Sequence, residues 1–247
     1  MDGTLLLIGL GAAAAGFAQG ISGFAFSLVA LSVWAWGINP VLAAVLAVFG
    51  SLVGQLVTLP FVWRGFNLRQ ALPFILGGLV AIPIGAQFVG AADPTLFKFV
   101  LGLFLLIYCP AMLLMRPDLR ITAGGRVADA VVGWIGGVLG GFSGLSGPAP
   151  TLWATLRGLS KDEQRGILQG FNIAMHTGTL AVYAASGRIV ADMAAPLAVT
   201  GLVLVPFAIM GVLAFRQLST VGFRRLVLMV LTVSGLVLVW GAVAAWV

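Results

Sequence analysis

Three polar side chains share one helical face inside an apolar run of the second half of the chain. Asn172, His176 and Thr179 follow an i, i+4, i+7 spacing, which aligns them along one side of a helix. An amide, a neutral imidazole and a hydroxyl can all donate hydrogen bonds while carrying no net charge. At membrane depth, such residues usually face a cavity or a partner helix. The pattern therefore predicts a polar face that can contact a small solute.

The first half of the chain repeats this spacing with Ser51, Gln55 and Thr58. His176 is the only histidine, and its repeat partner Gln55 cannot titrate. Three roles stay open for His176: a neutral ring bonded between helices, a hydrogen-bond donor to the solute, or a titrating coupling group.

Two glycine-rich breaks interrupt the apolar runs that precede these faces. They read QGISGFAFSL at residues 19–28, the first tip, and GGFSGLSGPAP at residues 140–150, the second tip. A break leaves backbone N–H and C=O groups unpaired, which a membrane tolerates only where they are buried in protein or line a wet cavity. Pro148 and Pro150 can begin a returning helix. The N-terminus of that helix, with free N–H groups and a positive dipole, suits an anion.

Glycines at this depth have two interpretations. They can let neighbouring helices pack closely, which we expect of Gly16, Gly136 and Gly137. They can also let a solute approach the backbone, which we expect of the paired tips. No Lys or Arg is expected at the centre, so binding would depend on dipoles and neutral donors. The residues expected to contact the solute are Gln19, Gly20, Ser22, Gly23, Ser51, Gln55, Ser143, Gly144, Ser146, Gly147, Asn172 and His176.

The composition indicates what kind of protein must position these residues. Of 247 residues, 61% are hydrophobic and only 8% are charged, whereas soluble domains carry roughly 25% charged residues. The chain therefore belongs in a lipid bilayer. The net charge is +6, and the basic residues lie in short loops between apolar runs. This placement indicates that they orient the chain in a membrane and do not bind nucleic acid. The single cysteine, Cys109, excludes an internal disulfide.

Eight apolar stretches follow one another along the chain. Six of them match one crossing each, which takes about 20 residues. The other two, 4–36 and 128–156, are longer and contain the first and second tips. The single crossings are expected at 40–62, 68–90, 94–115, 166–186, 190–215 and 221–247.

The two halves of the chain resemble each other. GISGFAFSL at 20–28 aligns with GLSGPAPTL at 144–152. Two prolines downstream of each tip align at nearly the same offset. They are Pro73 with Pro196 and Pro83 with Pro206. Matches in the same order at a nearly constant offset indicate an internal duplication.

The basic residues test how each broken segment crosses the membrane. If it crossed once, Lys and Arg would divide almost evenly between the two sides. If it folds back as a hairpin, one side keeps only Lys98 and Arg188, which is the positive-inside pattern. The other side then collects Arg64, Arg69, Arg116, Arg120, Arg126, Arg157, Lys161, Arg165, Arg216, Arg224 and Arg225. We therefore expect hairpins with legs of about 14 residues, or about 20 Å, and tips near mid-membrane. Both termini are expected outside the cytoplasm.

The predicted fold is an all-α integral membrane protein made of two inverted repeats, each a broken glycine-rich helical hairpin followed by three transmembrane helices. The first repeat covers residues 1–115 and the second covers 128–247, with a basic cytoplasmic linker at 116–127. Each half then has an odd number of full crossings, so the halves insert in opposite senses.

Several enzyme signatures are missing from the sequence. All seven acidic residues lie at segment ends or in loops. There is no Walker motif, no HExxH motif and no Cys/His cluster with metal spacing. We expect no cofactor, no metal and no enzymatic activity, and ATP-driven transport is disfavoured.

The segments GFAQGISGFAFSLVAL and GFSGLSGPAPTLWATL carry a resemblance to the TauE/SafE family of sulfite exporters. The likeness covers essentially the whole chain, although the first half has Phe24 and Phe26 where the second has Pro148 and Pro150. The resemblance implies a bacterial inner-membrane transporter of sulfite or of an organosulfonate such as sulfoacetate.

Three functions are open at this point. We favour secondary transport of a small sulfur-containing anion, with export by alternating access around the two tips. The alternatives are a channel or carrier for another small solute, and a membrane scaffold that transports nothing. The expected partners are the anion and the lipid bilayer, with no nucleic acid, and a homodimer is left open.

Overall fold

The computed structural model describes residues 3–62, 67–89, 93–114, 121–215 and 220–246. Every regular element within these ranges is a helix and none is a strand, so the all-α prediction is confirmed. The helices of the first half are α1 (Gly3–Ser22), α2 (Phe26–Trp34), α3 (Pro40–Val62), α4 (Leu68–Gln87) and α5 (Pro94–Leu114). Those of the second half are α6 (Gly125–Ser143), α7 (Pro148–Leu156), α8 (Lys161–Ala185), the short 3-10 helix η2 (Ala191–Met193), α9 (Ala194–Phe215) and α10 (Thr220–Trp246).

Five helical segments of the described chain are long and apolar enough to cross a membrane. They are Gly3–Ser22, Pro40–Phe61, Leu68–Gln87, Thr95–Leu114 and Ala191–Ala214. α8 is not among them, because it begins with charged residues and carries Asn172 and His176 through its middle. Its 25 residues would nevertheless measure about 37 Å, enough for one crossing. From α10, Leu231–Trp246 is a shorter apolar helix.

Each broken segment folds back along itself. At the end of α2, Trp34 Nε1 donates to the carbonyl oxygen of Ile8 in α1 at 3.3 Å. Just before α6, Ile121 N donates to Leu156 O at the end of α7 at 2.8 Å. The prediction of equal legs is wrong. The outgoing helices α1 and α6 have 20 and 19 residues, whereas the returning helices α2 and α7 have 9 each. An outgoing leg is therefore long enough, at about 30 Å, to cross most of the bilayer.

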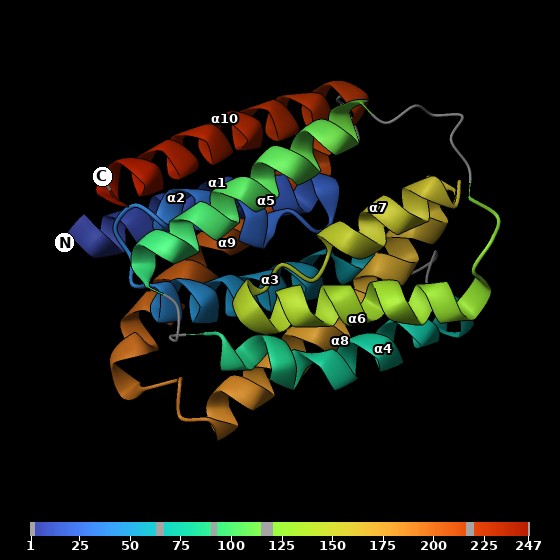
Figure 1. Ribbon diagram of the computed structural model, residues 1–247, viewed down its shortest axis with the longest axis horizontal. Helices are drawn as coiled ribbons and strands as arrows, with labels where there is room; N and C mark the ends of the chain where they lie inside the picture. The colour runs from blue at the N-terminus through green and yellow to red at the C-terminus, as the bar shows by residue number, and fades with distance from the viewer. Residues whose placement is uncertain (1–2, 63–66, 90–92, 115–120, 216–219, 247) are drawn as a thin grey trace.

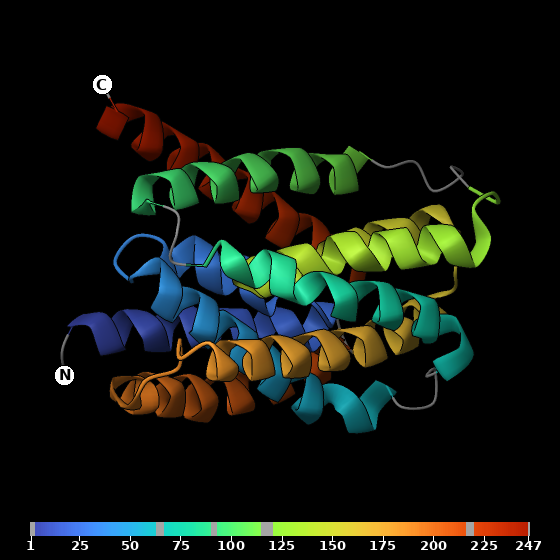
Figure 2. The same cartoon turned by 60° about the horizontal axis from the view of Figure 1, so that its bottom comes forward.

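The helix ends divide between two ends of the bundle. In Figures 1 and 2, the start of α1 and the end of α10 lie at the same end, on the left. The starts of α4, α6 and α8 lie at the opposite end and carry Arg69, Arg126 and Arg165. The start of α5, which carries Lys98, and the connection from α8 to η2, which carries Arg188, lie at the end that holds the start of α1 (Figures 1 and 2). Four of the basic residues assigned to one side, Arg64, Arg116, Arg120 and Arg216, lie outside the described residues.

Side chains cap the starts of helices where these leave the apolar runs. Ser160 and Glu163 form a reciprocal capping box at the start of α8. The hydroxyl and the backbone N–H of Ser160 both donate to this carboxylate and lower the pKa of Glu163. Asp93 accepts from the N–H groups of Thr95 and Leu96, which lowers its pKa and fixes the start of α5. These caps set where the chain enters a helix at each end of the bundle.

Glycines bring helices from the two halves into backbone contact. A Cβ on Gly137 of α6 would collide with the carbonyl oxygen of Gly78 in α4, and one on Gly16 of α1 would lie 2.8 Å from Leu204 O in α9. A Cβ on Gly136 would lie 2.8 Å from Ser146 O in the second tip. All three glycines therefore serve packing, as expected for close approach of helices in a membrane.

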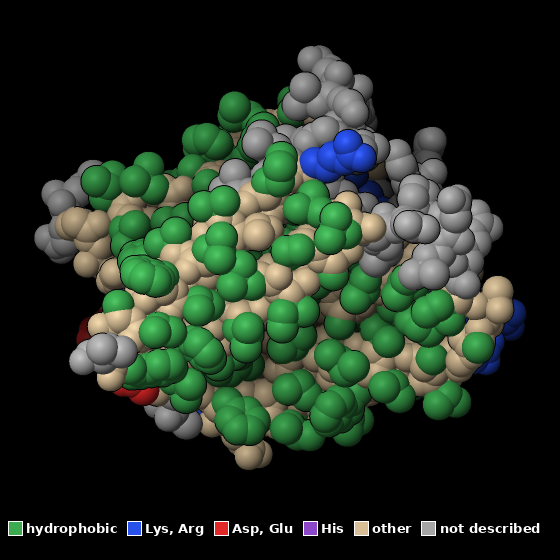
Figure 3. Space-filling view, turned by 45° about the horizontal axis from the view of Figure 1, so that its top comes forward, with side chains coloured by type: hydrophobic (Ala, Val, Ile, Leu, Met, Phe, Trp, Pro, Cys, Tyr) green, Lys and Arg blue, Asp and Glu red, His purple; other side chains and the backbone are tan. Residues whose placement is uncertain are grey.

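The outer surface of the bundle is apolar. Large hydrophobic side chains such as Val80, Leu202 and Trp240 are each more than 70% exposed, which in water would be a costly surface. Figure 3 shows hydrophobic side chains spread over much of the face in view, with the visible Lys and Arg in its right half. Lipid tails would cover this surface and leave the charged ends of the bundle in water.

Candidate functional site

The first and second tips meet inside the bundle. A Cβ built on Gly147 of the second tip would lie 2.8 Å from the Cβ of Phe24 in the first tip. One built on Gly144 would lie 2.8 Å from Ser27 Oγ. Gly144 also ends α6 with φ +74°, a left-handed conformation that favours glycine. Larger side chains at these two positions would force the tips apart.

The start of α7 lies open at this meeting point. The helix begins at Pro148, where the sequence predicts the returning leg, and no side chain caps it. Pro148 and Pro150 have no N–H group. The N–H groups of Ser146, Gly147 and Ala149 have no acceptor among the described residues. Unbonded N–H groups and the positive end of the helix dipole together make an anion-binding position.

Two side chains of α8 lie beside this helix start. Ser146 Oγ donates to Asn172 Oδ1 at 2.9 Å and lies 3.5 Å from His176 Nε2, and all three residues are buried. Asn172 Nδ2 and His176 Nδ1 have no hydrogen-bond partner among the described residues. Asn172 Nδ2 lies 3.5 Å from the Cβ position of Gly147. A buried amide without a partner costs about 1–3 kcal/mol, and a bound acceptor would recover that cost.

The start of α2 in the first tip is closed by the tip's own side chains. Ser22 Oγ accepts from Phe24 N at 3.3 Å and from Ala25 N at 3.0 Å. Gln19 Oε1 accepts from Phe26 N at 3.1 Å. The N–H group of Ala25, which aligns with the open one of Ala149, is therefore already bonded, whereas Phe24 and Phe26 align with prolines that have no N–H group. The two tips differ in chemistry although their sequences align.

Side chains of α3 and α8 hold the first tip in place. Gln55 Nε2 donates to Gly23 O at 2.8 Å, and the carbonyl oxygen of Gln55 accepts in turn from Gln169 Nε2. Arg165 Nη2 donates to Gly20 O at 3.1 Å, one of the carbonyls that the end of α1 leaves unbonded. The expectation that no Lys or Arg lies at the centre is therefore wrong on the side of the first tip.

Serines line the remaining contact between the tips. Ser27 Oγ lies 2.8 Å from Ser51 Oγ and 3.4 Å from Ala47 O. Ser143 is buried, and its hydroxyl has no partner among the described residues. Thr179 likewise has an unpartnered hydroxyl within the described chain, whereas its repeat counterpart Thr58 bonds back to Gly54 O at 2.9 Å.

A family model described as "Sulfite exporter TauE/SafE" matches residues 7–238, nearly the whole chain. The chain belongs to the TauE/SafE sulfite exporter family. No curated protein and no solved structure matches it. The family and the apolar helices together make this a multi-pass membrane protein of a transporter family, not of an enzyme family.

In this TauE/SafE chain, the predicted contact residues fall into three groups. Ser143, Gly144, Ser146, Gly147, Asn172 and His176 surround the open start of α7. Gln19, Ser22, Gly23, Ser51 and Gln55 close or hold the first tip. Gly20 stands apart from both groups, because its carbonyl oxygen accepts from Arg165 and a Cβ on it would collide with the carbonyl oxygen of Ala208 in α9. Its Cβ position is thus taken up by packing against α9.

Three contributors to this TauE/SafE site were missed from the sequence. Ser27 bonds across to α3, and Gln169 and Arg165 extend the polar face of α8 toward its start. Arg165, Gln169, Asn172 and His176 follow one helical stripe. Extending the stripe toward the N-terminus would have found the first two. Arg165 was instead counted with the loop charges.

Proposed function

We propose that this TauE/SafE protein is a secondary transporter that exports a small sulfur-containing anion across the bacterial inner membrane. The substrate is sulfite or an organosulfonate such as sulfoacetate. The observation that carries this proposal is the start of α7, which is buried but uncapped and lies beside the unpaired Nδ2 of Asn172. A sulfite or sulfonate group presents several oxygen acceptors. The N–H groups of Ser146, Gly147 and Ala149 and the Asn172 amide would donate to them.

Neutral donors suit a site that must release its anion. A buried Lys or Arg beside the second tip would hold an anion through a desolvated charge pair, which is costly to break. Backbone dipoles and an amide instead give binding that a small rearrangement of the tips reverses. His176 lies beside the same helix start, because its Nε2 is 3.5 Å from Ser146 Oγ. We assign it the role of a hydrogen-bond donor to the anion. Gln19 Nε2, also unpartnered among the described residues, is a further donor from the first tip.

The helix contacts support two inverted repeats, predicted at residues 1–115 and 128–247, the second of which begins with α6 at Gly125. α1 packs on α9 as α6 packs on α4, and α9 packs on α3 as α4 packs on α8. α5 packs on α10 and α3 packs on α8. Exchanging each helix for its counterpart in the other half leaves these pairs unchanged, as a two-fold relation requires. Alternating access would then move one hairpin and its partner helix against the other around the meeting tips.

The distribution of charge supports the orientation. The end of the bundle with Arg69, Arg126 and Arg165 faces the cytoplasm under the positive-inside rule. Both termini are then extracytoplasmic, and the residues between α5 and α6 form a basic cytoplasmic linker, which ends at Gly124 and not at residue 127 as predicted, because α6 begins at Gly125.

Flux measurements in proteoliposomes test the proposed function. Vesicles loaded with sulfite or sulfoacetate should release it at a rate that saturates with internal concentration. External anion of the same kind should accelerate release by exchange. A channel would give flux that rises linearly without exchange. A scaffold would give no flux above empty vesicles. Either result would remove the transporter assignment.

A further inference from the structure

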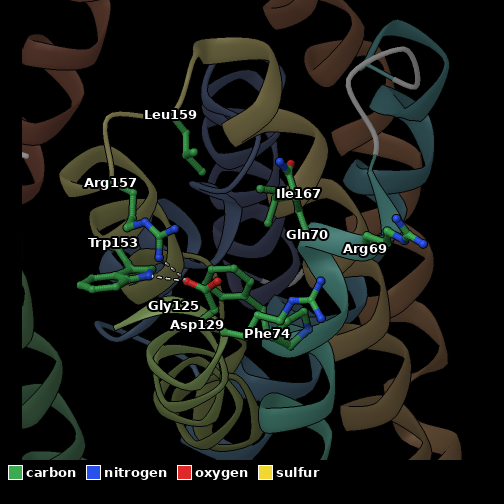
Figure 4. Close-up of a pocket in the computed structure, with 11 residues that line it drawn as sticks. Arg69, Gln70, Phe74, Gly125, Asp129, Trp153, Arg157, Leu159 and Ile167 are labelled. Carbon is green, nitrogen blue, oxygen red and sulfur yellow. Dashed lines mark hydrogen bonds and ion pairs between the residues drawn. The ribbon is translucent and has the colours of Figure 1, made fainter. Parts of the chain in front are cut away.

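A cavity lined by charged and aromatic residues lies at the opposite end of α7 from the second tip. It has a volume of about 240 Å³ and is formed by the first turns of α4, α6 and α8 and the end of α7. Figure 4 shows Trp153, Arg157 and Asp129 on one wall, Gln70 and Ile167 across from them, and Arg69 at the edge of the group. None of these residues belongs to the site between the tips.

The charge around this cavity is positive. Arg157 Nη1 lies 3.3 Å from Asp129 Oδ1, the only ion pair among the described residues. Trp153 Nε1 donates to the same Asp129 oxygen at 2.7 Å, and the Arg157 guanidinium lies 5.9 Å from the Trp153 ring. Asp129 is therefore already neutralised. Arg126 lines the cavity and Arg69 lies at its edge with the guanidinium turned outward (Figure 4). Neither has a carboxylate partner within the described chain, so an anion placed there would meet positive charge that no carboxylate compensates.

The start of α6 adds a second attraction for an anion. Gly124 precedes the helix with φ +99° and supplies no side-chain cap. Gly125 and Arg126, the first two residues of α6, line the cavity. The 19-residue helix therefore points its positive dipole end and uncapped N–H groups at a cavity that Arg126 also lines.

A pair of aromatic rings separates this cavity from the meeting tips. Phe74 lines the cavity, and its ring centroid lies 6.4 Å from that of Phe171 at an interplanar angle of 72°. Phe171 is fully buried and lies on α8 next to Asn172. The Cβ position of Gly136 is 2.8 Å from Ser146 O and 3.0 Å from Phe171 Cζ. The two rings thus stand between the cavity and the second tip.

We propose that this cavity is a second anion-binding site, a cytoplasmic vestibule that receives the exported oxyanion before it passes Phe74 and Phe171. The inference rests on the proposed function for the class of anion, sulfite or a sulfonate. The observations that support it are two unpaired guanidinium groups, a helix start and a cavity large enough for one such anion. An anionic lipid phosphate shares this chemistry, and the test separates the two sources.

The emission of Trp153 reports on the cavity directly, because its indole N–H is bonded inside it. Protein in nanodiscs of zwitterionic lipid is titrated with sulfite and with sulfoacetate. The difference spectrum between wild type and Trp153→Phe isolates this tryptophan from the other six. A saturable change should appear, and it should persist in Asn172→Asp, which disables the second tip. Because the signal should persist in Asn172→Asp, binding in the cavity can be detected even if the site between the tips binds no anion.

Charge variants locate the binding. Arg126→Gln should raise the half-saturating concentration roughly threefold to tenfold, as loss of one partly exposed cation would, while Arg126→Lys should stay near wild type. Arg225→Gln removes an exposed cation of the same predicted side that does not line the cavity and should change nothing. In vesicles, Arg126→Gln should raise the KM of export and leave kcat unchanged.

Three results would overturn the vestibule. The first is no saturable Trp153 signal with either anion. The second is a signal that Asn172→Asp abolishes, which would assign it to the second tip. The third is suppression of the signal by anionic lipid, with lipid retained by wild type and lost from Arg126→Gln in mass spectra. That result would make the cavity a headgroup site instead.

Discussion

Ser146 and Ser22 align in the two tips, but their hydroxyls have different partners. Ser22 Oγ donates to Ala18 O in its own helix and accepts from the N–H groups just before α2, whereas Ser146 Oγ donates to Asn172 Oδ1 on α8. The difference depends on the partner available on the following helix. An acceptor on α8 draws the Ser146 hydroxyl away from its own helix start. The N–H groups of α7 are thereby left for a ligand.

His176 is the residue whose possible roles differ most in consequence. Its Nε2 lies 3.5 Å from Ser146 Oγ, and no carboxylate bonds to it in the described chain. We expect His176→Gln to keep at least about a third of the export rate, because glutamine can still donate to the anion. The response to an imposed pH gradient should also stay. Transport in proteoliposomes with and without the gradient measures both. Loss of gradient-driven accumulation with exchange intact would show that His176 carries a proton.

The sequence predicted the side chains of the second tip better than those of the first. Asn172, His176 and Ser146 could be brought together from the i, i+4, i+7 spacing and the aligned breaks, because a helix fixes which residues share a face. The sequence could not show in the same way that Gly20 packs against another helix while Gly23 does not. Both are small residues in one break, and only the position of α9 decides that Gly20 packs against Ala208.

At the scale of elements, the hairpins depend on glycines in two structural roles, contact between the tips and close packing of helices. Gly147 lets the tips come into contact at the uncapped start of α7, with Phe24 Cβ 2.8 Å from its Cβ position. Gly137 lets α6 lie on the backbone of α4 at Gly78. One substitution tests the first role and another tests the second.

We expect Gly147→Leu to abolish export while the protein inserts and purifies normally. Its side chain would press the tips apart at Phe24 and cover the N–H groups of α7, whereas the α4–α6 and α1–α9 contacts that hold the bundle stay intact. Gly137→Leu should instead lower the yield and the unfolding temperature, since overpacking costs about 1–3 kcal/mol or more. Gly3→Leu, which has open space around it, is the control for the added side chain. Normal export by Gly147→Leu would contradict this prediction, because it would show that the anion does not approach the N–H groups of α7 at Gly147.

The unequal lengths of the hairpin legs could not be predicted from the sequence. The first and fifth apolar runs have no internal marker of the turn other than the breaks themselves. In the first half, Ser22 and Gln19 bond the N–H groups of Phe24, Ala25 and Phe26, and α2 begins only at Phe26. Pro148 marks the corresponding helix start directly. The proline is a local signal, whereas the side-chain caps depend on how the tip folds.

At the scale of the whole molecule, the distribution of Lys and Arg predicted the hairpins before any contact was known. Charges are informative here because loops between short crossings have few other residues that distinguish the two sides of a membrane. The cavity of Arg126 and Asp129 was not predicted. Asp129 lies five residues into α6, and its pairing with Arg157 needs the hairpin to close.

The topology predicts that both termini face away from the cytoplasm. Cysteines in place of Asp2 and Val247, on a Cys109→Ala background, should both react with an impermeant thiol reagent in intact cells. Cys109 is buried, so its removal also lowers background labelling. A cysteine in place of Glu163, at the predicted cytoplasmic start of α8, should react only after lysis. Labelling of one terminus alone would contradict the inverted arrangement of the halves.

The central claim is that an anion binds at the start of α7 through backbone N–H groups and the Asn172 amide. Calorimetric titration of purified protein with sulfite and with sulfoacetate, comparing wild type with Asn172→Asp, tests it most directly. The variant keeps the size and the Oδ1 acceptor for Ser146 but replaces the donor with a carboxylate. Asn67→Asp makes the same change at the start of α4, where only an acceptor is needed.

We predict saturable binding of one of these anions to wild type and to Asn67→Asp with equal affinity. Asn172→Asp should bind it at least about tenfold to a hundredfold more weakly, the loss of one hydrogen bond to a charged group. Equal affinity in Asn172→Asp would contradict the account, because the anion would then bind away from the start of α7.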